Sequence, residues 1–264
     1  MFEAQLEKAS TLKKIIDSIK DLINEAPFDC SENAICLQAM DSSHVALVSL
    51  KLSIELFEAY RCDRTVSLGL NLTNVAKALK CANNDDVCIL RYTDHDQDNV
   101  TFAFHDTGKT KTQEITIKLM DIDNEHLGIP DQKYAATIEM SSSEFAKTCR
   151  DISQFTDSVT IAAVKGGITF SGKGDTGSNI VTYNGETDAE NTDALITFEI
   201  NENVTSTFSI KYMLMFAKAA GLSERVRLSL SEGVPVVVEF KINEDAGYLR
   251  YYLAPKIDED ADMD

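Results

Sequence analysis

Along most of the chain, apolar and polar residues alternate with the period of two that is typical of β-strands, or β-branched residues form short continuous runs. Such runs, bounded by turn residues, predict a protein made mainly of strands and arranged as two packed sheets or one closed sheet. The predicted strands span residues 45–52, 66–72, 87–92, 99–104, 114–119, 136–140, 158–164, 194–200, 226–230, 234–242 and 247–253.

Four segments depart from this pattern and carry apolar residues at the spacing i, i+3, i+4, i+7, which predicts amphipathic helices. At 100° per residue, Lys77 and Lys218 fall about 140° from the centres of their apolar stripes, so both face away from the core. We therefore expect each helix to bury one face and to present basic residues on the other. The stripes are Leu12, Ile15, Ile16 and Ile19; Leu72, Val75, Ala76 and Leu79; Phe145, Thr148, Cys149 and Ile152; and Met213, Phe216, Ala217 and Ala220.

The chain carries signs of an internal duplication. A shift of 133 residues places Lys14 on Lys147, and a shift of 141 residues places Lys77 on Lys218. Each half then has strands and two helices on one face of a sheet, which predicts an α+β fold with two topologically similar β-sheet-plus-two-helix domains. Between the halves the strand pattern is lost, which predicts a connector. The expected parts are a domain of residues 1–118, the connector at 119–135, a domain of residues 136–257 and an acidic tail without fixed structure at 258–264.

Charge is divided unevenly along the chain. Its 264 residues, with a mass of 29.2 kDa, carry a formal net charge of -18. Residues 11–20, 72–81, 141–150 and 210–219, which overlap the four helical stripes, together hold nine bases and two acids, a net charge of +7 in forty residues. The other 224 residues therefore carry -25. One surface can attract a polyanion while the rest of the protein repels it.

Composition and cysteine spacing exclude several classes of protein. No apolar run approaches the roughly 18 to 20 residues that cross a bilayer, and the first residues lack a basic and then apolar signal region, so we expect a protein inside the cell with no membrane partner. With 44% apolar residues, the chain can bury a full core. The six cysteines form no CxxC pair, which favours reduced, mostly buried thiols over disulfides or zinc. They are Cys30, Cys36, Cys62, Cys81, Cys88 and Cys149.

Three patterns resemble catalytic or ligand sites but depart from them at decisive positions. Residues 167–173 resemble a phosphate-binding loop, but Gly174 stands where Mg²⁺ coordination needs Ser or Thr, and the segment alternates like a strand. Residues 94–98 carry three aspartates like the start of a calcium loop, yet Asn99 replaces the glycine of its sharp turn, so a hairpin is expected. The four histidines are scattered and no nucleophile signature accompanies them. We therefore predict no metal, no cofactor and no catalytic residue.

Four segments add a resemblance to a known family. Residues 40–48 (MDSSHVALV), 60–64 (YRCDR), 119–130 (LMDIDNEHLGIP) and 251–257 (YYLAPKI) closely resemble proliferating cell nuclear antigen, the family of eukaryotic DNA sliding clamps. The similarity runs from the first residues almost to the last. The resemblance implies the DNA clamp fold, in which two similar domains form each subunit, and three subunits close head to tail into a homotrimeric ring whose lining helices face DNA.

The resemblance gives the basic helix residues a role. Carried over by position, they lie on or near the lumen of the ring and meet the phosphates of double-stranded DNA without reading its sequence. Strand-rich edges at residues 110–118 and 178–184 match the family's subunit contacts, and Lys165, in an expected hairpin turn, aligns with its ubiquitin-acceptor lysine. The basic residues are Lys13, Lys14, Lys20, Lys77, Lys80, Lys147, Arg150, Lys211 and Lys218.

The resemblance also implies a second site, a groove for short client peptides with aromatic anchors. Its residues come from the first half of the chain, from the connector and from the second half, and several of them would be read as core residues in isolation. They are Met40, His44, Val45, Leu47, Leu127, Gly128, Ile129, Pro130, Pro235, Tyr252, Leu253, Ala254 and Pro255.

The predicted function is that of a DNA sliding clamp, a non-catalytic processivity factor of replication and repair in the nucleus. It encircles duplex DNA and binds polymerases, the clamp loader, nucleases and ligases, and a tethered enzyme rebinds at high effective concentration instead of diffusing away. Two alternatives stay open: a subunit of the heterotrimeric checkpoint clamp, and a β-rich peptide-binding adaptor with no role on DNA. An enzyme is disfavoured because no catalytic constellation is present.

Overall fold

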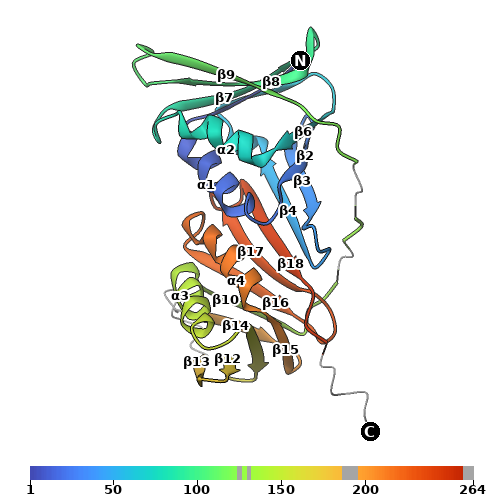
Figure 1. The fold of residues 1–264 in the computed structure, drawn as a ribbon, viewed down its shortest axis with the longest axis vertical. Coiled ribbons are helices and arrows are strands. Elements are labelled where there is room, and N and C mark those ends of the chain that lie inside the picture. The colour runs from blue at the N-terminus through green and yellow to red at the C-terminus, as the bar shows by residue number, and fades with distance from the viewer. Residues whose placement is uncertain (124–126, 130–131, 186–195, 258–264) are drawn as a thin grey trace. The chain divides into compact units, whose positions relative to one another are not determined.

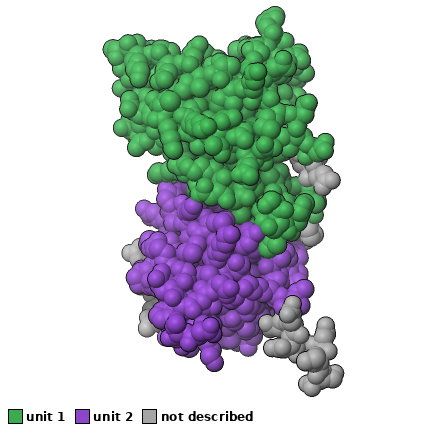
Figure 2. All heavy atoms as spheres, viewed as in Figure 1, with its two compact units in different colours: residues 1–129, 241–249 green, residues 130–240, 250–264 purple. Residues whose placement is uncertain are grey.

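The computed structural model describes residues 1–123, 127–129, 132–185 and 196–257 of the chain. The chain divides into two compact units, which Figure 2 colours separately. Unit 1 comprises residues 1–129 and 241–249, and unit 2 comprises residues 130–240 and 250–264. The acidic tail expected at residues 258–264 lies outside the described residues.

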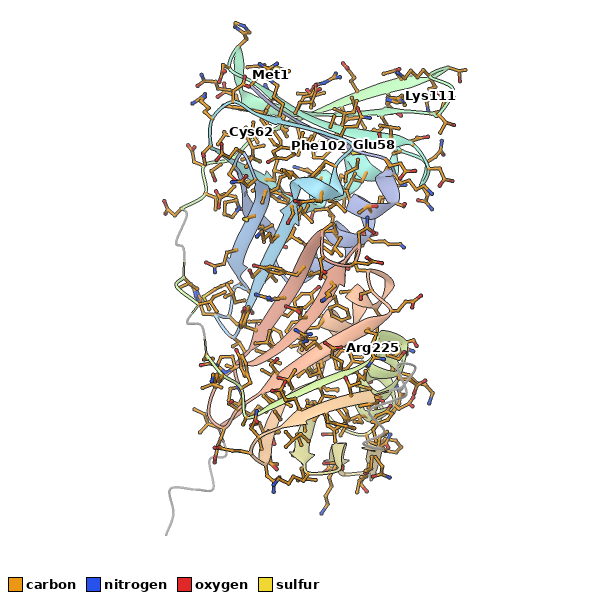
Figure 3. All side chains as sticks on the ribbon, turned by 180° about the vertical axis from the view of Figure 1, so that it is seen from behind. Met1, Glu58, Cys62, Phe102, Lys111 and Arg225 are labelled. Carbon is orange, nitrogen blue, oxygen red and sulfur yellow. The ribbon has the colours of Figure 1, made fainter. Side chains whose placement is uncertain are left out.

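Unit 1 consists of two sheets and two helices (Figure 1). The strands run antiparallel to their neighbours in two sets, ordered β5-β1-β7-β8-β9 and β4-β3-β2-β6. Leu12 of α1, Val75 of α2 and Phe102 of β8 (labelled in Figure 3) line one small core cavity, so helices and sheets share a single core. The elements are β1 (Phe2–Leu6), α1 (Ala9–Ile19), β2 (Glu25–Cys30), β3 (Ala34–Met40), β4 (Ala46–Ser53), η1 (Ile54–Leu56), β5 (Ala59–Cys62), β6 (Val66–Asn71), α2 (Leu72–Lys80), β7 (Val87–Thr93), β8 (Asp96–His105) and β9 (Thr112–Lys118).

Unit 2 has the same composition of sheets and helices. Its two strand sets are ordered β14-β10-β16-β17-β18 and β13-β12-β11-β15. Residues 241–249, which comprise the end of β17, the turn that follows and the start of β18, belong to unit 1, where Ser53 N–H donates a hydrogen bond to Ala246 O at 2.9 Å. The elements are β10 (Ala136–Ser141), α3 (Ser142–Ser153), β11 (Ser158–Val164), β12 (Gly167–Gly174), β13 (Gly177–Asn184), β14 (Ile196–Ile200), β15 (Val204–Ser209), α4 (Ile210–Phe216), η2 (Ala217–Gly221), β16 (Arg225–Leu230), β17 (Val236–Ile242) and β18 (Gly247–Leu253).

The two units repeat one plan element by element. Apart from short 3-10 segments, the described residues of each follow the order strand, helix, five strands, helix, three strands. The sheet orders correspond as well, because β5-β1-β7-β8-β9 maps onto β14-β10-β16-β17-β18 and β4-β3-β2-β6 maps onto β13-β12-β11-β15. The predicted internal duplication and the predicted α+β class with two similar halves are both confirmed.

The predicted elements are present, and the structure adds several others. Each predicted helix is found, although the fourth is α-helical only to Phe216 and continues as the 3-10 turn η2. Strands β1, β2, β3, β5 and β15 were not predicted. Pro27 lies inside β2 and lacks the N–H that a strand needs, and Ser206 occupies an inward position of β15, so neither segment shows a clean apolar alternation.

All six cysteines are free, as expected. Cys88 and Cys149 are buried, and burial raises the pKa of each thiol to about 12, so both stay protonated at neutral pH and react slowly. Cys81, at the end of α2, is exposed. Among the described residues, no helix is both long enough and apolar enough to cross a membrane.

The start of the connector is fixed along strand β6. Met120 N–H donates to Gly69 O at 2.9 Å. A Cβ atom on residue 69 would lie 2.0 Å from Met120 O, which is closer than real Cβ contacts come. Glycine at position 69 therefore allows the chain after β9 to lie against β6.

Replacing Gly69 by Ala should lower the melting temperature by about 2–12 °C. Overpacking of this kind typically costs roughly 1–3 kcal/mol, and each kcal/mol corresponds to about 2–4 °C in a chain of this size. Differential scanning calorimetry measures the shift. Gly128→Ala is the matched control, because nothing lies within 4 Å of a Cβ there, and its melting temperature should stay within about 1 °C of the parent's. Equal melting temperatures for the two variants would contradict the close contact.

Candidate functional site

The helices of unit 1 present basic side chains on their outer faces. α2 buries its predicted apolar stripe and leaves Lys77 and Lys80 exposed in its last turn, where the helix dipole favours positive charge. On α1, Lys14 is exposed and Lys20 follows the last helical residue. The two helices pack against each other (Figure 1). The predicted division into a buried apolar face and an exposed basic face is therefore present in unit 1.

The helices of unit 2 follow the same division. α3 buries Phe145 and Ile152 and leaves Lys147 and Arg150 exposed. α3 packs against α4 and η2, where Lys211 and Lys218 are exposed while the interior face is buried. Eight of the nine predicted basic residues thus lie on outward faces or at a helix end.

Lys13 is the exception. Its ammonium donates to Ala82 O at 2.6 Å and to Asn84 Oδ1 at 3.1 Å, in the loop between α2 and β7. The same loop caps the start of α1, because Ser10 N–H donates to Asn84 O at 3.1 Å and no side chain caps this helix. Lys13 is therefore committed to joining α1 to the end of α2, unlike its neighbour Lys14.

The two predicted subunit edges are terminal strands of their sheets. β9 ends the set β5-β1-β7-β8-β9, and β13 ends the set β13-β12-β11-β15. β13 alternates half-buried and exposed residues along its whole length and carries the exposed Ile180. Each strand therefore offers one row of backbone N–H and C=O groups to a further strand.

In unit 1, the predicted peptide-binding residues that follow β3 form a tight turn. The Asp41 carboxylate is buried and accepts hydrogen bonds from Val45 N–H at 2.9 Å and from Ala46 N–H at 2.8 Å. His44 adopts the left-handed conformation with φ of 55°. Val45 is exposed at the tip, and Leu47 is buried at the start of β4 opposite Met40. Asp41, whose carboxylate shapes this turn, was not predicted as a site residue.

The connector carries exposed apolar side chains at residues 127 and 129. Leu127 is 41% exposed and Ile129 is 36% exposed. The backbone of Leu127 is hydrogen-bonded to the side chain of Gln38, on β3. Pro130, also predicted to bind clients, lies outside the described residues. Gln38 was not predicted, because no pattern in the sequence connects it to the connector.

In unit 2, the predicted client residues differ in exposure. Pro235 and Ala254 are exposed, and Tyr252 and Pro255 are half-buried. Leu253, in contrast, is fully buried at 0%, so its side chain belongs to the core of the unit and is not available to a peptide in this conformation.

The segment after β18 is fixed by Lys256. Its N–H donates to Thr207 O at 2.8 Å, and its ammonium donates to Ser158 Oγ. These bonds hold the residues around Pro255 along β15 and β11.

Lys165 lies in a two-residue hairpin turn, as predicted. Val164 and Gly167 pair across the turn between β11 and β12, and Gly166 has a φ of 101°, which glycine adopts without strain. The Lys165 side chain is exposed, while its N–H donates to Asn203 Oδ1 at 3.3 Å.

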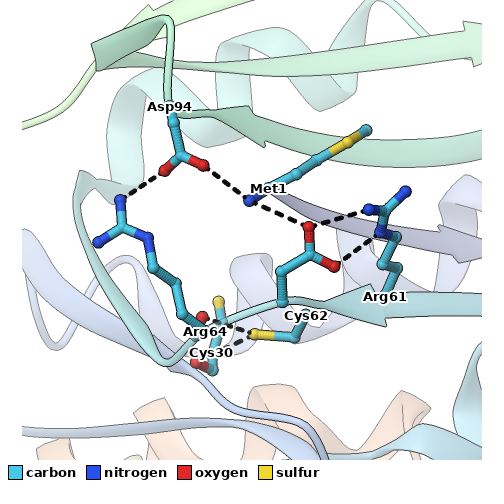
Figure 4. Close-up of polar contacts among 7 residues, drawn as sticks. Met1, Cys30, Arg61, Cys62, Arg64 and Asp94 are labelled. Carbon is cyan, nitrogen blue, oxygen red and sulfur yellow. Dashed lines mark hydrogen bonds and ion pairs between the residues drawn. The ribbon is translucent and has the colours of Figure 1, made fainter.

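The patterns that resembled ligand sites have structural roles. Residues 167–174 form strand β12 between β11 and β13, as expected, and not a phosphate loop. Thr93 pairs with Asp96 in the expected β7–β8 hairpin. Asp94 binds Arg64 and the Met1 ammonium (Figure 4), and the hydrogen bond from Arg64 holds the pKa of this carboxyl below its usual value. No group of potential metal ligands occurs within the described part of the chain.

Comparison with protein families matches both units. A family model described as "Proliferating cell nuclear antigen, N-terminal domain" matches residues 1–126, and one described as "Proliferating cell nuclear antigen, C-terminal domain" matches residues 128–256. The chain belongs to the proliferating cell nuclear antigen family. Among curated proteins it is 60% identical to "Proliferating cell nuclear antigen" of Caenorhabditis elegans, over 264 residues that cover 100% of both chains.

Membership of the proliferating cell nuclear antigen family confirms the clamp fold and the sliding-clamp function expected from the resemblance. The chain is a non-catalytic processivity factor, forms homotrimers, encircles DNA and binds polymerases and other replication and repair factors. The checkpoint-clamp and adaptor alternatives are not favoured.

Proposed function

We propose that the outward basic residues of α1, α2, α3 and the α4–η2 segment line the lumen of the clamp and contact DNA phosphates. The main support is the separation of charge. The exposed faces of the helices are basic, whereas the rest of the chain has a negative net charge. Lys13 contributes by joining α1 to the α2–β7 loop. The proposed contacts are Lys14, Lys20, Lys77, Lys80, Lys147, Arg150, Lys211 and Lys218.

These contacts suit a protein that must move along DNA. A lysine ammonium on a flexible stem attracts phosphates at many positions and reads no base edge, so the attraction is nearly the same at each step along the duplex. Its strength depends on salt through counterion release. We also propose that β9 of one subunit pairs with β13 of the next, because a head-to-tail contact between unlike edges closes into a ring when the rotation permits.

Replacing Lys20, Lys77 and Lys80 by Ala should weaken DNA contact and flatten its dependence on salt. Each lost phosphate contact lowers the slope of log K against log salt by about 0.9. Fluorescence anisotropy on short duplexes across a salt series measures the slope. Light scattering should still give a mass three times 29.2 kDa. An unchanged slope would show that these three lysines do not face DNA.

Lys13→Met is the matched control for this experiment. It removes one lysine charge from the same region but retains the apolar stem of the side chain. Because Lys13 is bonded to Ala82 and Asn84, its loss should lower the melting temperature and leave the salt slope within experimental error. Lys14→Met should show the opposite pattern.

We further propose that exposed residues of the turn after β3, the connector and the segment after β18 bind short client peptides. Val45, Leu127 and Ile129 are large apolar side chains left exposed in unit 1, and burial of such side chains by an aromatic-anchored peptide removes them from water. The turn and the C-terminal segment are both held by hydrogen bonds, so they lose little conformational entropy on binding. The other proposed members are Met40, His44, Leu47, Gly128, Pro130, Pro235, Tyr252, Ala254 and Pro255.

The double variant Leu127→Ala with Ile129→Ala should weaken binding of a Gln-x-x-Leu-x-x-Phe-Phe peptide by roughly thirtyfold or more. Truncation of apolar anchors that become buried on binding costs on the order of 2 kcal/mol. Titration calorimetry measures the affinity, and a primer-extension assay should show loss of polymerase stimulation. Both side chains are exposed, so the melting temperature should hardly change. Undiminished peptide affinity would show that the connector is not part of the binding groove.

Lys165 is our proposed site of ubiquitin attachment. Its exposed side chain, on the turn between β11 and β12, is accessible to a conjugating enzyme. Lys165→Arg should abolish monoubiquitination of the DNA-loaded ring in a reconstituted reaction, measured by gel shift and mass spectrometry. Lys173→Arg, on the neighbouring strand β12, is the control and should be modified like the parent. Equal modification of Lys165→Arg and the parent would exclude this lysine.

Two further proposals concern the location of the protein in the cell and the bounds of its domains. We propose that the protein acts in the nucleus, where its duplex DNA and replication partners are found. We also propose the functional boundaries 1–118 and 136–257 for the two clamp domains, 119–135 for the connector and 258–264 for the acidic tail.

A further inference from the structure

At residue 127 the connector is held to strand β3 by the side-chain amide of Gln38. Gln38 Nε2 donates to Leu127 O at 3.0 Å, and Leu127 N–H donates to Gln38 Oε1 at 2.8 Å. The two bonds fix the orientation of the carboxamide, because a flipped amide would oppose donor to donor and acceptor to acceptor. The glutamine thus makes the pair of bonds that a partner residue makes in an antiparallel sheet.

Gln38 lies next to an apolar part of the proposed client groove. Leu37 points into the core, so strand alternation places Gln38 and Met40 together on the opposite face of β3. Across the ladder, Ser49 lies opposite Gln38 and Leu47 lies opposite Met40. The Gln38–Leu127 contact therefore lies beside the Met40–Leu47 pair on one face of the β3–β4 hairpin.

The described connector residues have little else to order them. Residues 119–123, 127–129 and 132–134 lie in neither a helix nor a strand. Leu127 and Ile129 are both exposed, so burial of apolar surface does not fix them. The connector's first fixed points are the hydrogen bonds from Leu119 N–H to Asp98 O at 2.8 Å and from Met120 N–H to Gly69 O at 2.9 Å. Gln38 supplies the next one, and without it the backbone at residue 127 regains conformational freedom that a bound peptide would have to remove again.

We propose that Gln38 is a positioning residue of the client groove. Its carboxamide clamps residue 127, so that Leu127 and Ile129 stand in place before a peptide arrives. The inference rests on the client groove proposed above and adds a residue that acts without touching the peptide. A pre-positioned connector enlarges the fraction of protein that is competent to bind. The Gln38–Leu127 contact therefore acts mainly on the association rate of the peptide.

Two variants of the full-length protein test the Gln38–Leu127 contact directly. Gln38→Met keeps the length of the side chain and removes both bonds, whereas Gln38→Glu keeps an acceptor for Leu127 N–H and sets a carboxylate against Leu127 O. Gln97→Met is the control, because the Gln97 side chain donates to the turn carbonyl of Asp94 at 3.3 Å and Gln97 lies on β8, outside the β3–β4 hairpin. Amide hydrogen exchange at Leu127, followed by NMR, should accelerate at least tenfold in Gln38→Met, less in Gln38→Glu and not at all in Gln97→Met. An unchanged exchange rate at Leu127 in Gln38→Met would show that Gln38 does not hold the connector, and would overturn the inference.

Peptide binding kinetics test the positioning role. In surface plasmon resonance with the Gln-x-x-Leu-x-x-Phe-Phe peptide, Gln38→Met should weaken affinity about tenfold, as expected for two ordinary hydrogen bonds. The loss should lie in the association rate, with trimer mass unchanged and the melting temperature lowered by about 3–6 °C, which is the same tenfold change expressed in stability. A loss confined to the dissociation rate would make Gln38 a peptide contact and overturn the inference.

The double connector variant separates this inference from the groove itself. Undiminished peptide affinity in Leu127→Ala with Ile129→Ala overturns the groove and, with it, the role of Gln38. Reduced affinity in that variant together with parental affinity in Gln38→Met overturns the positioning role alone.

Discussion

Because each helix has to bury its apolar stripe against a sheet, hydrophobic packing decides where the ordered positive charge of this chain can lie. Ile15 and Ile19 of α1, Phe145 of α3 and Met213 of α4 are all fully buried. Rotating any of these helices by one residue would expose such side chains, at about 1.5–3 kcal/mol each. That exceeds the ordinary contribution of a solvent-exposed ion pair, about 0–1 kcal/mol. The basic faces are thus oriented by the core, and the lysines need no contacts of their own to point outward.

The strong negative charge of the rest of the chain is compatible with DNA binding. Exposed charges are screened over about 8–10 Å at physiological ionic strength, so a phosphate next to a helix responds to nearby lysines and little to distant carboxylates. The acidic residues act on other surfaces, where they oppose adhesion of nucleic acid. Segregation of charge therefore favours one mode of contact, and the net charge of -18 does not measure affinity for DNA.

The sequence was sufficient for features that repeat with a regular period and insufficient for those made by distant residues. The helices and most strands were predicted because their apolar residues recur at fixed spacing, whereas Pro27 lies inside β2 and obscures the strand pattern there. Basic character was predictable, but the different roles of Lys13 and Lys14 depend on the fold, which brings the carbonyl of Ala82 to Lys13. Gln38 and Leu127 are 89 residues apart, and neither carries a local sign of their contact.

Burial also separated residues that the resemblance had grouped together. Tyr252 and Leu253 are adjacent in one motif, but strand alternation exposes part of the first and buries the second completely. A motif therefore identifies a segment, and the pleat of the strand decides which of its side chains can meet a partner.

The element-by-element correspondence of the two units has a geometric consequence. β18 corresponds to β9, and β4 corresponds to β13. Within unit 1 the start of β18 already lies against β4, since a Cβ on Gly247 would come 2.3 Å from Lys51 O. A union of β9 with β13 between chains would place side by side two strands whose counterparts, β18 and β4, already lie against each other within unit 1. A closed trimer would then contain six copies of one element plan, two from each of its three chains.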